Sequence, residues 1–134
     1  MPSLHLAEAH TEGGGTAYTY ELTWEAPGLG GVLGACHGLD VPLVFGTLRG
    51  EFAALLLGEE PPDEAVALSA RMGEAWTAFA ATGDPGWAPY RPKERLTRVL
   101  DATPRTAAYP EEASRLIWAD HAFTALEPGP GPAS

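Results

Sequence analysis

The sequence is poor in cysteine and in positive charge. It contains a single cysteine, Cys36, in 134 residues, which excludes an internal disulfide and a cysteine-rich zinc site. Lysine and arginine number 8 against 18 aspartates and glutamates, so the net charge is −10. Because phosphate backbones repel a chain of this charge, we expect no nucleic-acid partner.

Long apolar runs and recognisable cofactor motifs are also missing. No stretch reaches the roughly 18–20 apolar residues of a membrane-spanning helix, so we expect no membrane partner. The first ten residues have neither the basic start nor the apolar stretch of an export signal, which predicts a cytoplasmic location. We find no metal-ligand cluster and no phosphate-binding glycine loop, and therefore expect no metal and no cofactor.

What is present is the composition of one globular domain with many turns. Hydrophobic residues make up 45% of the chain, and 16 glycines with 13 prolines indicate short elements joined by loops. The clearest strand is 17–24, where Tyr18, Tyr20, Leu22 and Trp24 alternate with smaller or polar residues. The other expected elements are helices at 2–10, 63–80 and 111–122, a helical turn within 39–45, and a strand at 96–100.

The helix predicted at 63–80 indicates that the chain belongs to something larger. Its apolar stripe consists of Ala65, Leu68, Met72, Trp76 and Phe79. Burying large apolar side chains contributes roughly 1.5–3 kcal/mol each, whereas ordering the backbone of such a helix costs on the order of 18–36 kcal/mol. The helix therefore requires a large partner surface, and two short strands provide little of it.

Among the residues that could carry chemistry, one histidine stands apart. His5 and His10 lie on different sides of a helix and cannot share a metal ion, and His121 fits an exposed helix end. His37 follows a glycine-rich loop, where an imidazole could transfer protons near neutral pH, but a structural loop histidine explains these residues better. No serine lies in a G-x-S-x-G motif, and Cys36 should point away from its neighbour His37.

Five motifs in order resemble the C-terminal quarter of type B carboxylesterases, the cholinesterase-like branch of the α/β-hydrolases. They are TAYTYEL at 16–22, GACHGLDVPLVFG at 34–46, LSARMGEAWTAFA at 68–80, TGDP at 82–85 and WAPY at 87–90. The resemblance implies an α/β fold: a C-terminal fragment of an α/β-hydrolase, with a small remnant sheet, two main helices and long loops. It assigns residues 1–126 to that domain and leaves 127–134 as a disordered Gly/Pro tail.

The resemblance also implies roles for four residues. His37 becomes the catalytic histidine, the general acid/base that serves a serine nucleophile. Asp40 is not the acid of the triad. By the resemblance it lies near the pocket, behind the residues that touch the substrate. Leu39 and Phe45 line or support the acyl or alcohol pocket, with core packing as the alternative for both. The nucleophile elbow, the oxyanion-hole glycines and the triad acid of that family have no counterpart in these 134 residues.

These implications lead to two readings of the function. In the first, the chain is a C-terminal segment of a serine carboxylic ester hydrolase that meets a small-molecule ester only when a missing N-terminal part completes the site, and it is inactive alone. In the second, it is a non-catalytic relic or interaction module, which complements a separate N-terminal piece or self-associates through its exposed sheet edge.

Overall fold

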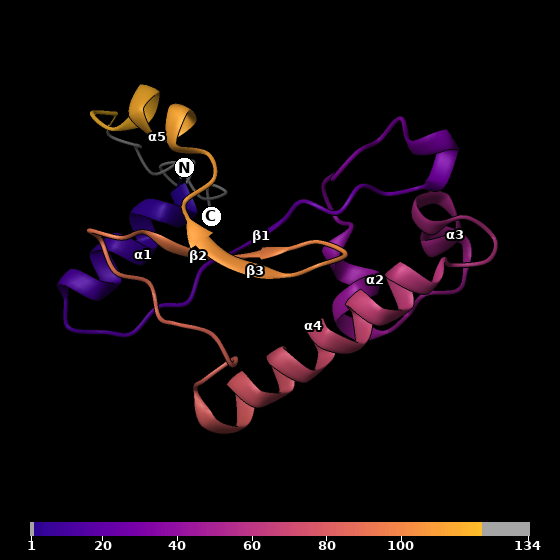
Figure 1. Ribbon diagram of the computed structural model, residues 1–134, viewed down its shortest axis with the longest axis horizontal. Helices are drawn as coiled ribbons and strands as arrows, with labels where there is room; N and C mark the ends of the chain where they lie inside the picture. The colour runs from indigo at the N-terminus through magenta and orange to yellow at the C-terminus, as the bar shows by residue number, and fades with distance from the viewer. Residues whose placement is uncertain (1, 122–134) are drawn as a thin grey trace, which may run out of the picture.

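The computed structural model describes residues 2–121. The helices are α1 (Pro2–Glu12), α2 (Asp40–Phe45), α3 (Glu51–Leu57), α4 (Asp63–Thr82) and α5 (Glu112–Trp118), and Gly28–Gly31 form a 3₁₀ helix, η1. The strands are β1 (Tyr20–Leu22), β2 (Leu96–Leu100) and β3 (Arg105–Ala108). Figure 1 shows α1 and α5 gathered at one end of the sheet, α2 and α3 beyond its other end, and α4 running lengthwise beside it.

The three strands form one sheet in the order β1-β2-β3. β1 is parallel to β2, with Tyr20 opposite Arg98 and Leu22 opposite Leu100. β3 is antiparallel to β2. A parallel pair needs a long crossover connection, and the segment containing α2, α3 and α4 supplies it. Within residues 2–121, β1 is therefore paired on one side only.

The strand predicted at 17–24 is shorter than expected, but its alternation is confirmed. Only Tyr20–Leu22 form the ladder. It stops at Leu22 because β2 ends at the opposite residue, Leu100, and the flanking backbone makes isolated bonds such as the one from Thr23 N to the Leu100 carbonyl. Leu22 and Trp24 belong to the main core with α4 residues. The other face carries hydroxyl contacts, including Thr19 to the Leu96 carbonyl at 2.7 Å.

The long helix is confirmed as α4, the 20-residue segment Asp63–Thr82. Gly83 ends it in the left-handed conformation and donates its N–H to the Phe79 carbonyl. The predicted stripe is buried only in its first half: Ala65, Leu68 and Met72 are inaccessible, whereas Phe79 remains 50% exposed. The helix is therefore longer than the core that it covers in the described part of the chain.

The main core lies where α2, α3 and the first half of α4 meet the ends of β1 and β2. Leu39 and Leu43 are fully buried there. The buried Ser69 hydroxyl donates to the Leu43 carbonyl at 2.7 Å and so links α4 to α2. At the entry of α4, Trp24 Nε1 donates to Glu64 Oε2 at 3.2 Å. These contacts fix α2 against α4.

The structure adds three elements that the sequence pattern did not predict, namely η1, α3 and β3. α3 packs close to η1, where a side chain at Gly28 would collide with the Leu55 carbonyl. The third predicted helix, 111–122, shortens to Glu112–Trp118 and buries none of its side chains. The tail predicted at 127–134 lies outside the described residues.

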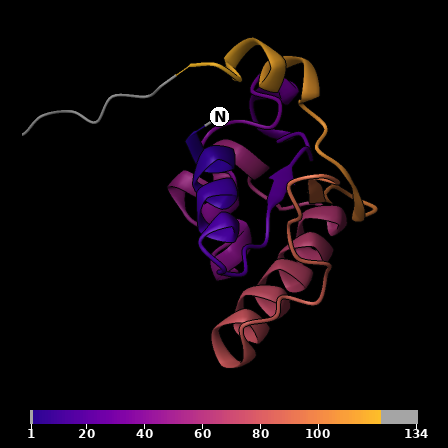
Figure 2. The same ribbon diagram turned by 90° about the vertical axis from the view of Figure 1, so that its left-hand side faces the viewer.

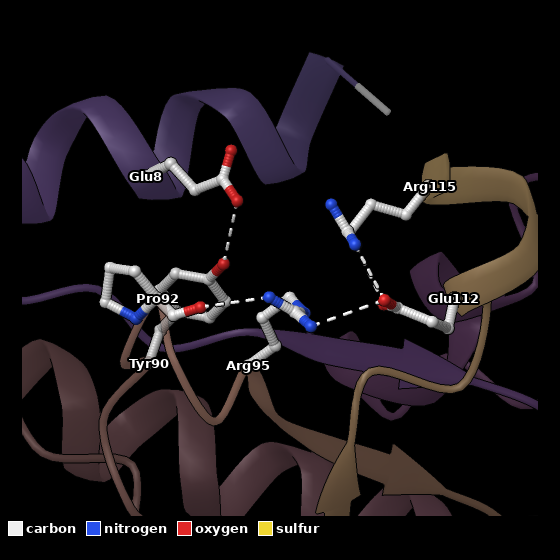
Figure 3. Close-up of polar contacts among 6 residues, drawn as sticks. All are labelled: Glu8, Tyr90, Pro92, Arg95, Glu112 and Arg115. Atoms are coloured by element: carbon white, nitrogen blue, oxygen red, sulfur yellow. Dashed lines mark hydrogen bonds and ion pairs between the residues drawn. The ribbon is translucent and has the colours of Figure 1, made fainter. Parts of the chain in front are cut away.

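A polar cluster joins α1, α5 and the connection before β2 at the end of the sheet away from α2. Tyr90 donates its hydroxyl to Glu8 Oε1 at 3.2 Å, and both Arg95 and Arg115 bind the Glu112 carboxylate (Figure 3). Burial, followed by the charge of Glu8, raises the pKa of Tyr90 to about 12, so its phenol stays a donor. Figure 2 shows this end from the side, with α5 above α1.

Candidate active site

His37 lies on the loop between η1 and α2, just before α2 begins. Gly38 follows it at φ +80°, a conformation that favours glycine, and the chain then enters α2 at Asp40. The His37 side chain is exposed, and within residues 2–121 its imidazole has no hydrogen-bond or ion-pair partner. The neighbouring Cys36 is half-buried and packs against the main core. The His37 imidazole is thus exposed on a loop that is packed against the main core through the neighbouring Cys36.

The two residues predicted to line a pocket occupy opposite environments. Leu39 is fully buried in the core of this chain and anchors the histidine loop. Phe45, at the end of α2, is 75% exposed. Phe45 is therefore available to a surface outside the described residues, whereas Leu39 acts here through packing. Their roles toward a substrate stay predictions.

Asp40 is tied to the sheet by a residue that the sequence analysis did not assign to the site. The Tyr20 hydroxyl donates to Asp40 Oδ2 at 3.4 Å, and the Tyr20 ring meets Trp76 of α4 edge-on, with centroids 4.8 Å apart. Burial, the charge of Asp40 and this hydrogen bond all raise the pKa of Tyr20. The strand pattern placed Tyr20 on the correct face, but no sequence signal pairs it with Asp40.

A groove of about 840 Å³ runs along β1, away from the histidine loop. Trp76 and Phe79 of α4 line it together with Trp87, whose buried Nε1 has no hydrogen-bond partner among the described residues. None of His37, Leu39, Asp40 or Phe45 belongs to its lining. The structure therefore does not bring the four predicted site residues together around this hollow.

The remaining candidate groups are scattered. His5 and His10 lie on α1, and His121 stacks edge-on against Trp118 near α5. No three histidine, cysteine, aspartate or glutamate side chains are grouped to hold a metal ion in the part of the chain that the structure describes. No helix among residues 2–121 is long and apolar enough to cross a membrane.

Comparison with known proteins relates the chain to esterases. It is 35% identical over 86 residues to the para-nitrobenzyl esterase of Bacillus subtilis, an alignment that covers 60% of this chain and 17% of that protein. It is 37% identical over 70 residues to a probable N-octanoylanthranilate hydrolase of Rhodococcus erythropolis, covering 50% of this chain and 15% of that protein.

The solved structures agree with these relatives in fold. The carboxylesterase EST55 of Geobacillus stearothermophilus superposes with a TM-score of 0.70 and 30% identity, covering 86% of this chain and 24% of that enzyme. The chain thus spans less than a fifth of the curated relatives and about a quarter of this solved structure, and its fold is a portion of an α/β-hydrolase.

The family is shown directly by its sequence model. The model described as the carboxylesterase family matches residues 1–115, which include the histidine loop, both strands of the parallel pair and all of α4. The match confirms the resemblance drawn from the five ordered motifs. The chain belongs to the carboxylesterase family.

Proposed function

We propose that the chain forms the histidine-bearing part of a serine carboxylic ester hydrolase, in which His37 is the general acid/base. One observation carries this proposal. The exposed His37 imidazole has no polar partner within residues 2–121, in a chain whose family model matches residues 1–115. An acid/base histidine needs a nucleophile on one ring nitrogen and an orienting acid on the other. Among the described residues, neither ring nitrogen of His37 has such a partner.

The proposed chemistry is acyl transfer through a serine supplied by residues outside this sequence. His37 accepts the hydroxyl proton as the serine oxygen attacks the ester carbonyl carbon, and it returns that proton to the departing alcohol. A water molecule then attacks the acyl-enzyme as His37 accepts its proton, and His37 returns that proton to the serine oxygen as the acid product leaves. In this proposal the exposed Phe45 at the end of α2 lines the acyl or alcohol pocket, and the buried Leu39 supports the loop from within the core.

The chain alone is expected not to hydrolyse esters, because no serine in it lies in a nucleophile motif and no hydroxyl within residues 2–121 is hydrogen-bonded to the imidazole. The assay measures p-nitrophenyl acetate and butyrate hydrolysis by the purified chain against its His37→Ala variant. A fluorophosphonate label is read by intact mass. Turnover lost in His37→Ala, with a label on one serine or on Cys36, would show that the chain builds a complete site of its own.

A chimera tests the acid/base role itself. The segment of the Bacillus subtilis para-nitrobenzyl esterase that aligns with this chain is replaced by the residues of this chain. We expect the folded chimera to hydrolyse p-nitrophenyl butyrate. A chimera that unfolds with the cooperativity of the parent esterase but shows no turnover would contradict the proposal.

A second candidate function, self-association as an interaction module, is favoured by the open side of β1. The strand has one neighbour in the described sheet, and the groove beside it exposes half of Phe79. An unpaired strand edge next to apolar surface is a docking site for another strand. In this reading a second copy of the chain covers the groove.

Sedimentation equilibrium of the purified chain over a wide concentration range tests this candidate. A dimer weakened by Phe79→Lys, but not by Val66→Lys, is the expected result, because Val66 is similarly exposed on α4 and lies outside the groove. A monomer at all concentrations removes this candidate and leaves the first proposal untouched.

A further inference from the structure

The base of the histidine loop is held by α4 at two points. The first is the buried hydrogen bond from Ser69 to the Leu43 carbonyl at 2.7 Å, which fixes the middle of α2. The second runs through β1, where Tyr20 contacts Trp76 of α4 with its ring and Asp40 with its hydroxyl. The first contact is backbone anchoring in the core, whereas the second reaches the residue that begins α2, three positions after His37.

The contact between Tyr20 and Asp40 is suited to orienting the start of α2. Asp40 begins the first turn of α2, and a phenol that donates to its carboxylate restrains that turn through a long hydrogen bond of 3.4 Å. The ring planes of Tyr20 and Trp76 cross at 76°, an edge-to-face arrangement that limits where the hydroxyl can lie. The raised pKa of Tyr20 keeps the phenol protonated at neutral pH.

We propose that Tyr20 is a positioning residue for His37: its hydroxyl holds Asp40 and the first turn of α2, so that the loop ending at Gly38 presents the imidazole in one orientation. This inference rests on the proposed role of His37. In this inference Tyr20 on strand β1 keeps the loop that carries His37 ordered, although the two are far apart in the sequence. Such ordering matters because a misplacement of about 1 Å can cost on the order of a hundredfold in rate.

The test uses the complete chain and compares Tyr20→Phe with Tyr18→Phe. Both changes remove only a hydroxyl, and Tyr18 has similar edge-on ring contacts with Phe79 and Trp87 at 5.9 and 6.5 Å. Carbon-13 NMR at neutral pH follows the chemical shift of the Asp40 carboxyl carbon, and nitrogen-15 relaxation reports the order of the His37 and Gly38 amides.

In Tyr20→Phe we expect the carbon-13 signal of the Asp40 carboxyl to move, because the variant removes the hydroxyl that donates to this carboxylate. We also expect the His37 amide order parameter to fall from about 0.85 toward 0.6. Tyr18→Phe should leave both values unchanged. An unchanged Asp40 carboxyl signal, or an unchanged order at His37, would overturn the inference.

A reciprocal measurement protects the test against a variant that fails to fold. In Asp40→Asn the loss of the negative charge should lower the pKa of Tyr20 toward its ordinary value. A Tyr20 titration that does not move would overturn the inference. None of these readouts depends on ester hydrolysis, so they are separate from the chimera assay, whose failure would remove the role of His37 and not the hydrogen bond.

Discussion

Replacing His37 by alanine in the chimera with the Bacillus subtilis para-nitrobenzyl esterase is expected to lower kcat by on the order of 10⁴-fold or more, with a much smaller effect on KM. The reason is that the histidine moves the proton in both half-reactions, and no other group in the described chain is placed to replace it. His5 and His10 lie on α1, at the end of the sheet opposite α2 (Figure 1).

His10→Ala is the matched control for this experiment. It removes an imidazole from an exposed position on α1 and should leave kcat within about twofold, as is usual for exposed positions away from a site. Single-turnover kinetics separates acylation from deacylation, and both steps should slow in His37→Ala. If His37→Ala retains more than about a tenth of the rate while the chimera remains folded, the imidazole is not the general acid/base.

The second large effect concerns stability. Leu68→Ala is expected to lower the free energy of unfolding by about 2–5 kcal/mol, because the side chain is fully buried where α4 meets α2 and the strand ends, and its loss leaves a cavity. Urea unfolding followed by circular dichroism measures the change. A cost of this size is a large fraction of the total stability of a small domain.

Val66→Ala on the same helix is the control for Leu68→Ala. Val66 is 47% exposed, so its truncation should change the free energy of unfolding by less than about 1 kcal/mol. If the two variants cost the same, the packing of α4 against α2 is not the main source of stability. The base on which His37 is mounted would then be less firmly held than the structure indicates.

Local periodicity was enough to place the long helix and the alternating strand. The stripe from Ala65 to Phe79 repeats at helical spacing and became α4, and Leu96–Leu100 became β2 as predicted. These segments could be predicted because an apolar period reports which face a segment buries, whatever it packs against. The ordered motifs likewise identified the carboxylesterase family, which the match over residues 1–115 confirmed.

The sequence pattern does not predict elements whose formation depends on the segment that they pair with or pack against. β3 is Arg105–Ala108, a segment with no alternation and little burial, and it is a strand because β2 offers it a ladder. α3 is short and lies between glycines at 50 and 58, and its packing against η1 depends on a close backbone approach at Gly28. The strand predicted at 17–24 ends early for a related reason, since β2 ends at Leu100, opposite Leu22.

For the site, the sequence by itself determined the family and singled out His37 and Asp40 through one motif. The tertiary structure decided how they are held. It buried Leu39, exposed Phe45, and placed Tyr20 against both Trp76 and Asp40. The physical reason is that periodicity records which side of a segment is apolar, whereas a hydrogen bond between residues 20 positions apart depends on how strand and helix pack, a property that neither segment carries alone.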